Sequence, residues 1–518
     1  MYTNSEQSRS LPAGNVPPGR GEFPHGAGIM RYLLGIDQGT TQTTAVVIDE
    51  NGLVVASRAA QIPVSFPQPG WVEQDPWDLV RTVRETVGPL VEAYPIEAVG
   101  FDNQGETFIL WDAESGEPLT PAVVWQDKRG VRVCESLAAR TDHEWLRRTT
   151  GLRLDSYFSA PKLRHVLDAR PDLARAAAQG GVRFGTTETW VLWQLSGGRL
   201  HVTDPSTASR TLLYNIQDLR WDPKLLELFG VDIRMLPEVR SSAGLVGTIE
   251  VAGQTLPLDA LLVDQQAALF GQACFNPGDM KCTFGTGSFL LMNVGNTPRL
   301  SSHGLLTTIA WQIGKHTSYA LDGGVFVAGA AVQWLAESLK LLPNVAASAA
   351  MAQASRDPGV VVVPALAGLA APHWMPEVRG AVFGLSRATT PEDLVRATLE
   401  GIACRVTEVV RAMEQDGGRV VSSLRVDGGP AANPFLMQAL ADLSGVEVRV
   451  AAEREATAVG VATLAGHSAL GLPLAELAAR WRAQATYAPL VGEDERETRL
   501  DRWRRALAAV QVFHDNQT

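Results

Sequence analysis

A short polar turn between two apolar segments is the feature that most constrains this chain. Asp37-Gln38-Gly39-Thr40-Thr41 separates the apolar segments 32–36 and 45–48. Segments this short on either side of a glycine turn predict a β-hairpin. The glycine allows backbone N–H groups to approach an anion, and the threonine hydroxyls add donors. An aspartate at the end of the first strand offers an oxygen ligand to Mg²⁺. The turn indicates either a nucleoside triphosphate site or an ordinary hairpin.

Two later segments repeat parts of this pattern. Residues 282–292 again combine a strand, a Gly/Thr turn and a strand, about half a chain further on. Residues 424–433 predict a strand that leads into a glycine-rich turn, and apolar residues 435–437 open a helix after it. Glycines in such a turn let a flat group, such as adenine or ribose, approach the backbone. Two phosphate-type hairpins followed by an adenosine-type turn favour the nucleotide interpretation.

Other nucleotide-binding devices and several classes of partner are excluded by the sequence. There is no Gly-x-x-x-x-Gly-Lys-Ser/Thr motif, so the chain has no P-loop. The net charge of −11 argues against a nucleic-acid partner. No apolar run reaches the ~20 residues of a membrane span, so no membrane insertion is expected. Four cysteines without a Cys-x-x-Cys pair favour a reducing cytoplasm.

The length of 518 residues requires more than one hydrophobic core. Strand patterns such as 98–101 alternate with helical patterns such as 77–93, which predicts α/β layers. We expect domains at 30–271 and 272–518, the second ending in helices over 474–484 and 495–512. Residues 1–29 are rich in glycine, proline and polar residues, which predicts a disordered tail or a misassigned start before Met30.

Further motifs point to one family. They lie at 70–76 (GWVEQDP), 122–126 (AVVWQ), 264–271 (DQQAALFG) and 380–400, which contains GAVFGL and ATLE. With these motifs the chain resembles the FGGY family of carbohydrate kinases, and within it the glycerol kinases, from about Arg31 to near the C-terminus. The resemblance implies the two-domain actin-like ATPase fold of sugar kinases, Hsp70 and actin, an α/β fold with a central nucleotide and substrate cleft.

The resemblance also implies a function. The implied reaction is ATP-dependent phosphorylation of a small polyol, glycerol in the first place. The implied cofactors are ATP and Mg²⁺, and the protein is either a monomer or a homo-oligomer. One alternative is an FGGY kinase for another polyol or a ketose sugar. A second alternative, from another class, is a nucleotide-binding sensor or chaperone-like ATPase on the same fold. The presence of Asp264 favours a catalytic protein over a sensor.

Asp264 is the candidate general base. It follows the apolar residues 261–263 and precedes the helical pattern 265–270, so it lies where a strand meets a helix. An aspartate there is typical of a helix N-cap, or it accepts a proton from an attacking hydroxyl. The resemblance implies the second role, since the position matches the catalytic aspartate of sugar kinases.

Other site residues are assigned by motif position. We expect Asp37, with Asp264, to bind Mg²⁺. The nucleotide-binding set is Thr40, Thr41, Gln42, Thr44, Thr286, Gly329, Gln333, Gly429 and Asn433. The substrate-binding set is Gly105, Glu106, Trp125, Tyr157, Asp264, Gln265 and Phe289.

The chain departs from glycerol kinases at several of these positions. Their motif Asn-Gln-Arg-Glu-Thr has an arginine that binds glycerol hydroxyls, and this chain has Gly105 there. Thr44 replaces an arginine after the first turn, and Val263 replaces the glycine before the catalytic aspartate. His165 and Met375 replace a tryptophan and an aspartate. The loss of the substrate arginine predicts a shift toward longer polyols or sugars, which would use the vacated volume.

Overall fold

The computed structural model describes residues 30–356 and 359–515, so the predictions for residues 1–29 lie outside the described residues. A mixed sheet of thirteen strands runs through both halves of this described chain. The first half contributes, from one edge inward, β3 (Val54–Gln61), β2 (Gln42–Asp49), β1 (Tyr32–Gln38), β5 (Ile96–Asn103), β14 (Gln254–Val263) and β13 (Ala243–Val251). The second half continues with β17 (Leu306–Ile313), β18 (His316–Val325), β16 (Ser288–Gly295), β15 (Met280–Phe284), β21 (Ser423–Asp427), β22 (Glu447–Ala451) and β23 (Ala483–Tyr487).

The two predicted Gly/Thr hairpins are confirmed, and their strands pair with neighbouring strands in the same way. β1 pairs antiparallel with β2 and parallel with β5. β15 pairs antiparallel with β16 and parallel with β21. The third predicted segment is β21, which leads through a glycine-rich turn into helix α13 (Pro434–Ser444). Each half of the sheet therefore presents one hairpin turn beside the carboxyl end of a parallel strand.

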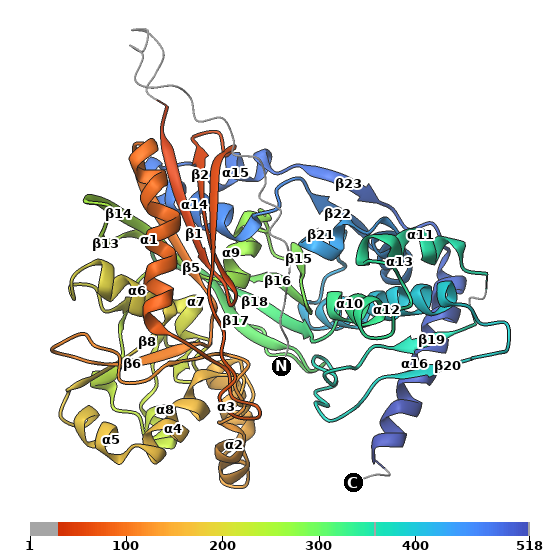
Figure 1. Ribbon diagram of the computed structural model, residues 1–518, viewed down its shortest axis with the longest axis horizontal. Coiled ribbons are helices and arrows are strands. Elements are labelled where there is room, and N and C mark those ends of the chain that lie inside the picture. Colours follow the sequence, from red (N-terminus) through yellow and green to blue (C-terminus); the bar gives the residue numbers. More distant parts are fainter. Residues whose placement is uncertain (1–29, 357–358, 516–518) are drawn as a thin grey trace.

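Helices cover the sheet in both halves (Figure 1). In the first half, α1 (Pro76–Ala93) packs on β2 and β3, and its N-cap Asp75 accepts a hydrogen bond from the backbone of Trp77. In the second half, α10 (Gly329–Glu337), α12 (Pro391–Gly417), α13 and α16 (Glu493–Asp515) lie together on the other side of the molecule. The largest core of buried side chains surrounds α12 and α13, a second lies in the first half, and a further core combines side chains from both halves.

Helix α14 (Ala456–Leu470) comes late in the chain but packs on strands of the first half. In Figure 1 it lies beside β1 and β2, and it contacts β5, β1, β14 and β13. The contact is close because a Cβ at Gly35 would lie 1.9 Å from the carbonyl oxygen of Ala458, and one at Gly100 would lie 2.1 Å from that of Val461. The C-terminal half thus supplies part of the core beneath the first hairpin.

The helix predicted over 474–484 is wrong in its second part. Helix α15 spans Leu474–Arg480, and residues 483–487 form β23, which pairs antiparallel with β22 at the edge of the sheet. The break lies at Trp481, whose backbone is extended and whose indole N–H donates to Gln272 Oε1 at 2.8 Å. The helix predicted over 495–512 is confirmed as part of α16. Within the described residues, no helix combines the length and apolar character needed to cross a membrane.

Candidate active site

Three aspartates gather where neighbouring strands end. In the register of the sheet, Asp37 on β1 lies opposite Asp102 on β5, and Leu262 on β14 lies opposite Asp102 from the other side. Because β1, β5 and β14 run parallel, their carboxyl ends meet at one edge. Asp264 directly follows β14 and is the first residue of helix α9 (Asp264–Gly271), where its carboxylate accepts from the backbone N–H of Gln265 at 2.7 Å. The N-cap itself is Val263, so Asp264 is not the N-cap.

Burial and neighbouring carboxylates raise the pKa of all three aspartates. Burial, and then the neighbouring Glu106, raise the pKa of Asp264 to about 6. Burial and the charge of Asp264 raise the pKa of Asp37. Burial, and then the charges of Asp37 and Asp264, hold the pKa of Asp102 well above its ordinary value. Sequence reasoning missed Asp102, although an acid at the end of the apolar strand 98–101 was a usable signal.

This cluster is suited to a magnesium ion that arrives with a nucleotide. Within the described residues, no group of three or more His, Cys, Asp and Glu side chains is arranged to hold a metal by itself. Asp37 and Asp264 nevertheless repel each other, and a divalent cation between them would relieve that repulsion. In kinase sites, Mg²⁺ takes one or two carboxylates and completes its shell with phosphate oxygens and water. The residues present fit that kind of binding.

A cavity of about 500 Å³ opens beside Asp264. The predicted substrate-binding residues all line it: Gly105, Glu106, Trp125, Tyr157, Asp264, Gln265 and Phe289. Two residues that sequence reasoning missed, Arg210 and Asp322, line it as well. Both are buried. Their burial depends on tertiary packing, and we see no local pattern that would have marked them.

Arg210 is the cation of this cavity. Its Nε donates to Glu106 Oε1 at 2.7 Å, and its Nη1 donates to Asp322 Oδ2 at 2.9 Å. These two carboxylates raise the pKa of the guanidinium, so it stays charged in spite of burial. Glu106 lies in the turn that follows β5 in the first half of the chain, and Asp322 lies on β18 in the second half. The arginine therefore joins the two halves of the molecule across the cavity.

The aromatic wall of the cavity is held by a buried lysine. The Nζ of Lys162 donates to the backbone oxygens of Tyr157 at 2.7 Å and Trp125 at 3.2 Å. The two rings meet edge to face, with their centroids 5.6 Å apart. Burial lowers the pKa of Lys162 to about 7. The indole N–H of Trp125 donates to Thr40 Oγ1 at 2.9 Å, so the wall also contacts the first hairpin turn.

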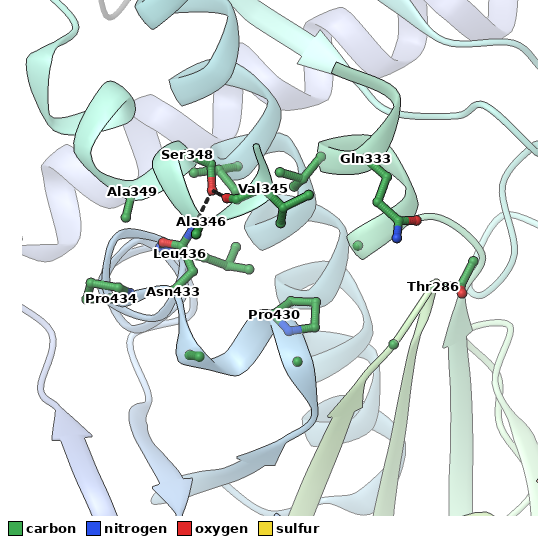
Figure 2. Close-up of a pocket in the computed structure, with 16 residues that line it drawn as sticks. Thr286, Gln333, Val345, Ala346, Ser348, Ala349, Pro430, Asn433, Pro434 and Leu436 are labelled. Atoms are coloured by element: carbon green, nitrogen blue, oxygen red, sulfur yellow. Dashed lines mark hydrogen bonds between the residues drawn. The ribbon is translucent and has the colours of Figure 1, made fainter. Parts of the chain in front are cut away.

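A second cavity, of about 610 Å³, lies in the C-terminal half (Figure 2). Its lining includes the predicted residues Thr286, Gly329, Gln333, Gly429 and Asn433. The rest of the wall is mostly apolar and includes Val345, Ala346, Pro430 and Leu436. In Figure 2, Thr286 and Gln333 lie across the cavity from Asn433, whose Nδ2 donates to Ser348 Oγ at 3.0 Å. An apolar slot with a few polar groups is typical of a site for a planar base.

The two cavities meet at the second hairpin turn, because Gly285 and Thr286 line both of them. Thr40 and Thr41 of the first turn line the 500 Å³ cavity too, so it has both hairpin turns in its wall. The remaining predicted residues, Asp37, Gln42 and Thr44, line neither cavity. Gln42 Nε2 donates to Thr44 Oγ1 at 2.9 Å. A ligand in the apolar slot could extend a phosphate chain past Thr286 toward Asp264.

Comparison with known proteins gives consistent matches. Residues 32–271 match the N-terminal domain of the FGGY family of carbohydrate kinases, and residues 280–469 match its C-terminal domain. A glycerol kinase of Aromatoleum aromaticum is 46% identical over 492 residues, which cover 92% of this chain and 98% of the relative. A glycerol kinase of Alkalilimnicola ehrlichii is 47% identical over 487 residues, covering 92% and 98%.

Solved structures agree with this assignment. The structure of Plasmodium falciparum glycerol kinase with ADP superposes with a TM-score of 0.88 at 31% identity, covering 93% of this chain and 98% of that one. A xylulose kinase from Lactobacillus acidophilus superposes with a TM-score of 0.84 at 21% identity, covering 93% and 98%, and supports the fold alone. These matches confirm the fold class that the sequence predicted.

Proposed function

The chain belongs to the FGGY family of carbohydrate kinases, and from this membership we propose that it transfers the γ-phosphoryl group of ATP to a hydroxyl of a small polyol, in the first place glycerol. One observation carries the proposal. The apolar slot and the polar cavity meet at Gly285 and Thr286, and Asp264 lies on the polar side of that junction. This arrangement suits a nucleotide in one cavity and an alcohol acceptor in the other.

In this proposal Asp264 accepts the proton of the attacking hydroxyl. A pKa near 6 leaves the carboxylate ionised at neutral pH and makes it a better proton acceptor than an ordinary aspartate. The neighbouring Gln265 is oriented by Lys281, whose Nζ donates to Gln265 Oε1 at 2.6 Å. A fixed Gln265 amide and the Glu106 carboxylate then offer a donor and an acceptor to the acceptor's hydroxyls.

Phosphoryl transfer depends on positioning and on neutralising charge. The hydroxyls and backbone N–H groups of Thr40, Thr41 and Thr286 are the donors we assign to the phosphates. When bound, Mg²⁺ would neutralise charge on the phosphate oxygens, and Asp37 and Asp264 are the carboxylates we assign to it or to its water ligands. A cytoplasmic location fits the four cysteines, all of which are free thiols in the described chain.

A second candidate function is phosphorylation of another polyol or a ketose. Gly105 favours it, since this position lacks the long polar side chain that the resemblance leads one to expect.

The experiment is product analysis with purified protein, ATP and Mg²⁺. We would incubate it with glycerol, four- and five-carbon polyols and ketoses, and identify phosphorylated products by ³¹P NMR and mass spectrometry. We expect a phosphate monoester of at least one polyol from the wild type, and far less of it from Asp264→Asn in the same time. ATP consumption without any phosphorylated acceptor would overturn the proposed function.

A further inference from the structure

We propose that Arg210 is the guanidinium that positions the polyol in this chain, and that Gly105 and Val263 form a size-matched pair that keeps a second long side chain out of the cavity. This inference rests on the proposed function, because it concerns the substrate of the same site. It assigns two specificity-determining positions and one positioning residue.

Packing, not backbone conformation, keeps position 105 a glycine. The φ angle of Gly105 lies outside the left-handed region, so other residues could adopt this backbone. A Cβ there would lie 2.8 Å from Cγ2 of Val263 and 3.5 Å from Cγ of Arg210. Real Cβ contacts are almost never that short, so a side chain at 105 requires Val263 to move.

Val263 has little freedom to move. Its side chain is 2% exposed, and the residue ends β14, where it lies opposite Asn103 on β5. It also immediately precedes Asp264, so any shift of Val263 disturbs the candidate base. The Val263 methyl thus takes part of the room that the missing arginine was expected to vacate. The Val263 side chain makes this part of the cavity wall apolar, which favours contact with a substrate carbon over contact with a hydroxyl.

Arg210 is the cation that lines the cavity in the absence of an arginine at position 105. Its Nε and Nη1 are used by Glu106 and Asp322. Within the described chain no hydrogen bond is formed by its Nη2, and the residue lines the cavity. The guanidinium carbon lies 5.7 Å from the centroid of Tyr157. A guanidinium whose Nε and Nη1 are both hydrogen-bonded is held in one orientation, so its remaining N–H groups have a fixed direction. An arginine held in this way can position a hydroxyl with little loss of side-chain conformational entropy.

A double-mutant cycle tests the matched pair. The variants are Gly105→Arg, Val263→Gly and Gly105→Arg/Val263→Gly, compared with the wild type in melting temperature and in kcat/KM for the best polyol. We expect Gly105→Arg alone to lower both, and the double variant to recover a large part of each loss. Val251→Gly is the matched control, because Val251 is buried on neighbouring β13 and lines neither cavity. It should lower stability without changing substrate preference.

Additive effects would overturn the matched pair. If Gly105→Arg changes kcat/KM and melting temperature equally with and without Val263→Gly, the two positions are independent. A wild type that phosphorylates no polyol contradicts the proposed function instead. The two failures are therefore distinguishable.

Arg210→Lys tests the positioning role, because lysine keeps the charge but loses the planar fork. We expect KM for the polyol to rise roughly ten- to a hundred-fold, as for the loss of a charged hydrogen bond, with KM for ATP unchanged. If that variant does not fold, Asp322→Asn releases only one side of the guanidinium and should raise the polyol KM alone. Equal changes in both KM values, or no change in the polyol KM, would overturn the role of Arg210.

Discussion

The environment of Asp264 determines what this one carboxylate can do. It is the first residue of α9, it lines the 500 Å³ cavity, and burial together with Glu106 keeps its pKa high. Asp264→Asn keeps the size and the helix position but removes the proton acceptor. We expect kcat to fall ~10²- to 10⁴-fold, the usual effect of losing a general base. ATP affinity, measured by calorimetry, should stay near that of the wild type, and near-normal turnover would rule out Asp264 as the base.

The same carboxylate predicts a pH dependence. A base acts only when it is deprotonated, so kcat/KM for the polyol should be constant near neutral pH and fall as the pH drops through about 6. Well below that value the decline should approach about tenfold per pH unit. Steady-state rates from pH 5 to 8 with saturating ATP would show it. Rates that stay level down to pH 5 would mean that the group is not the base or that its pKa is not raised.

At the level of residues, the sequence predicted the cavity wall well but not its charges. Every predicted substrate-binding residue lines the 500 Å³ cavity, because each was placed by a local motif. Arg210, Asp322 and Asp102 were not predicted. Arg210 and Asp322 gain their importance from burial beside each other, and only the fold brings them together, from the segment after helix α7 (Pro205–Ala208) and from β18. Asp102 instead ends β5 beside Asp37. Roles in binding remain predictions for all of them.

At the level of elements, the turns were predictable and the helix packing was not. Glycine and threonine between short apolar segments specify both hairpins locally. By contrast, nothing in residues 456–470 indicates that this helix packs on β1 and β5, which lie near the start of the described chain. The helix predicted over 474–484 extended past the end of α15 into the first residues of β23, whose pairing with β22 at the sheet edge overrides the local pattern.

The packing of α14 gives a prediction at this scale. Gly100→Ala puts a methyl group 2.1 Å from the carbonyl oxygen of Val461, so the helix must move off the sheet. We expect a loss of ~1–3 kcal/mol in the free energy of unfolding, measured in urea, as for overpacked cores. Gly492→Ala is the control: nothing lies within 4 Å of a Cβ there, and its effect should stay within about 0.5 kcal/mol. Equal effects of the two variants would contradict the close-packing argument.

At the level of the whole molecule, the two hairpin turns come from different halves of the sheet and line one cavity. Ligands that contact both turns should draw the halves together and exclude water from the reacting groups. Small-angle scattering should therefore show a smaller radius of gyration with a polyol and a non-hydrolysable ATP analogue together than with neither. An unchanged radius in the doubly liganded state would argue against closure.

We propose that an alcohol acceptor, and not water, receives the phosphoryl group at the junction of the two cavities. ADP release by the purified wild type, measured with and without glycerol and across a panel of polyols and sugars, tests it most directly. We expect slow ADP release with ATP alone, a strong increase with at least one polyol, and no such increase for Asp264→Asn. ADP release that is the same with and without every acceptor would contradict it and would favour a nucleotide-binding sensor or ATPase on this fold.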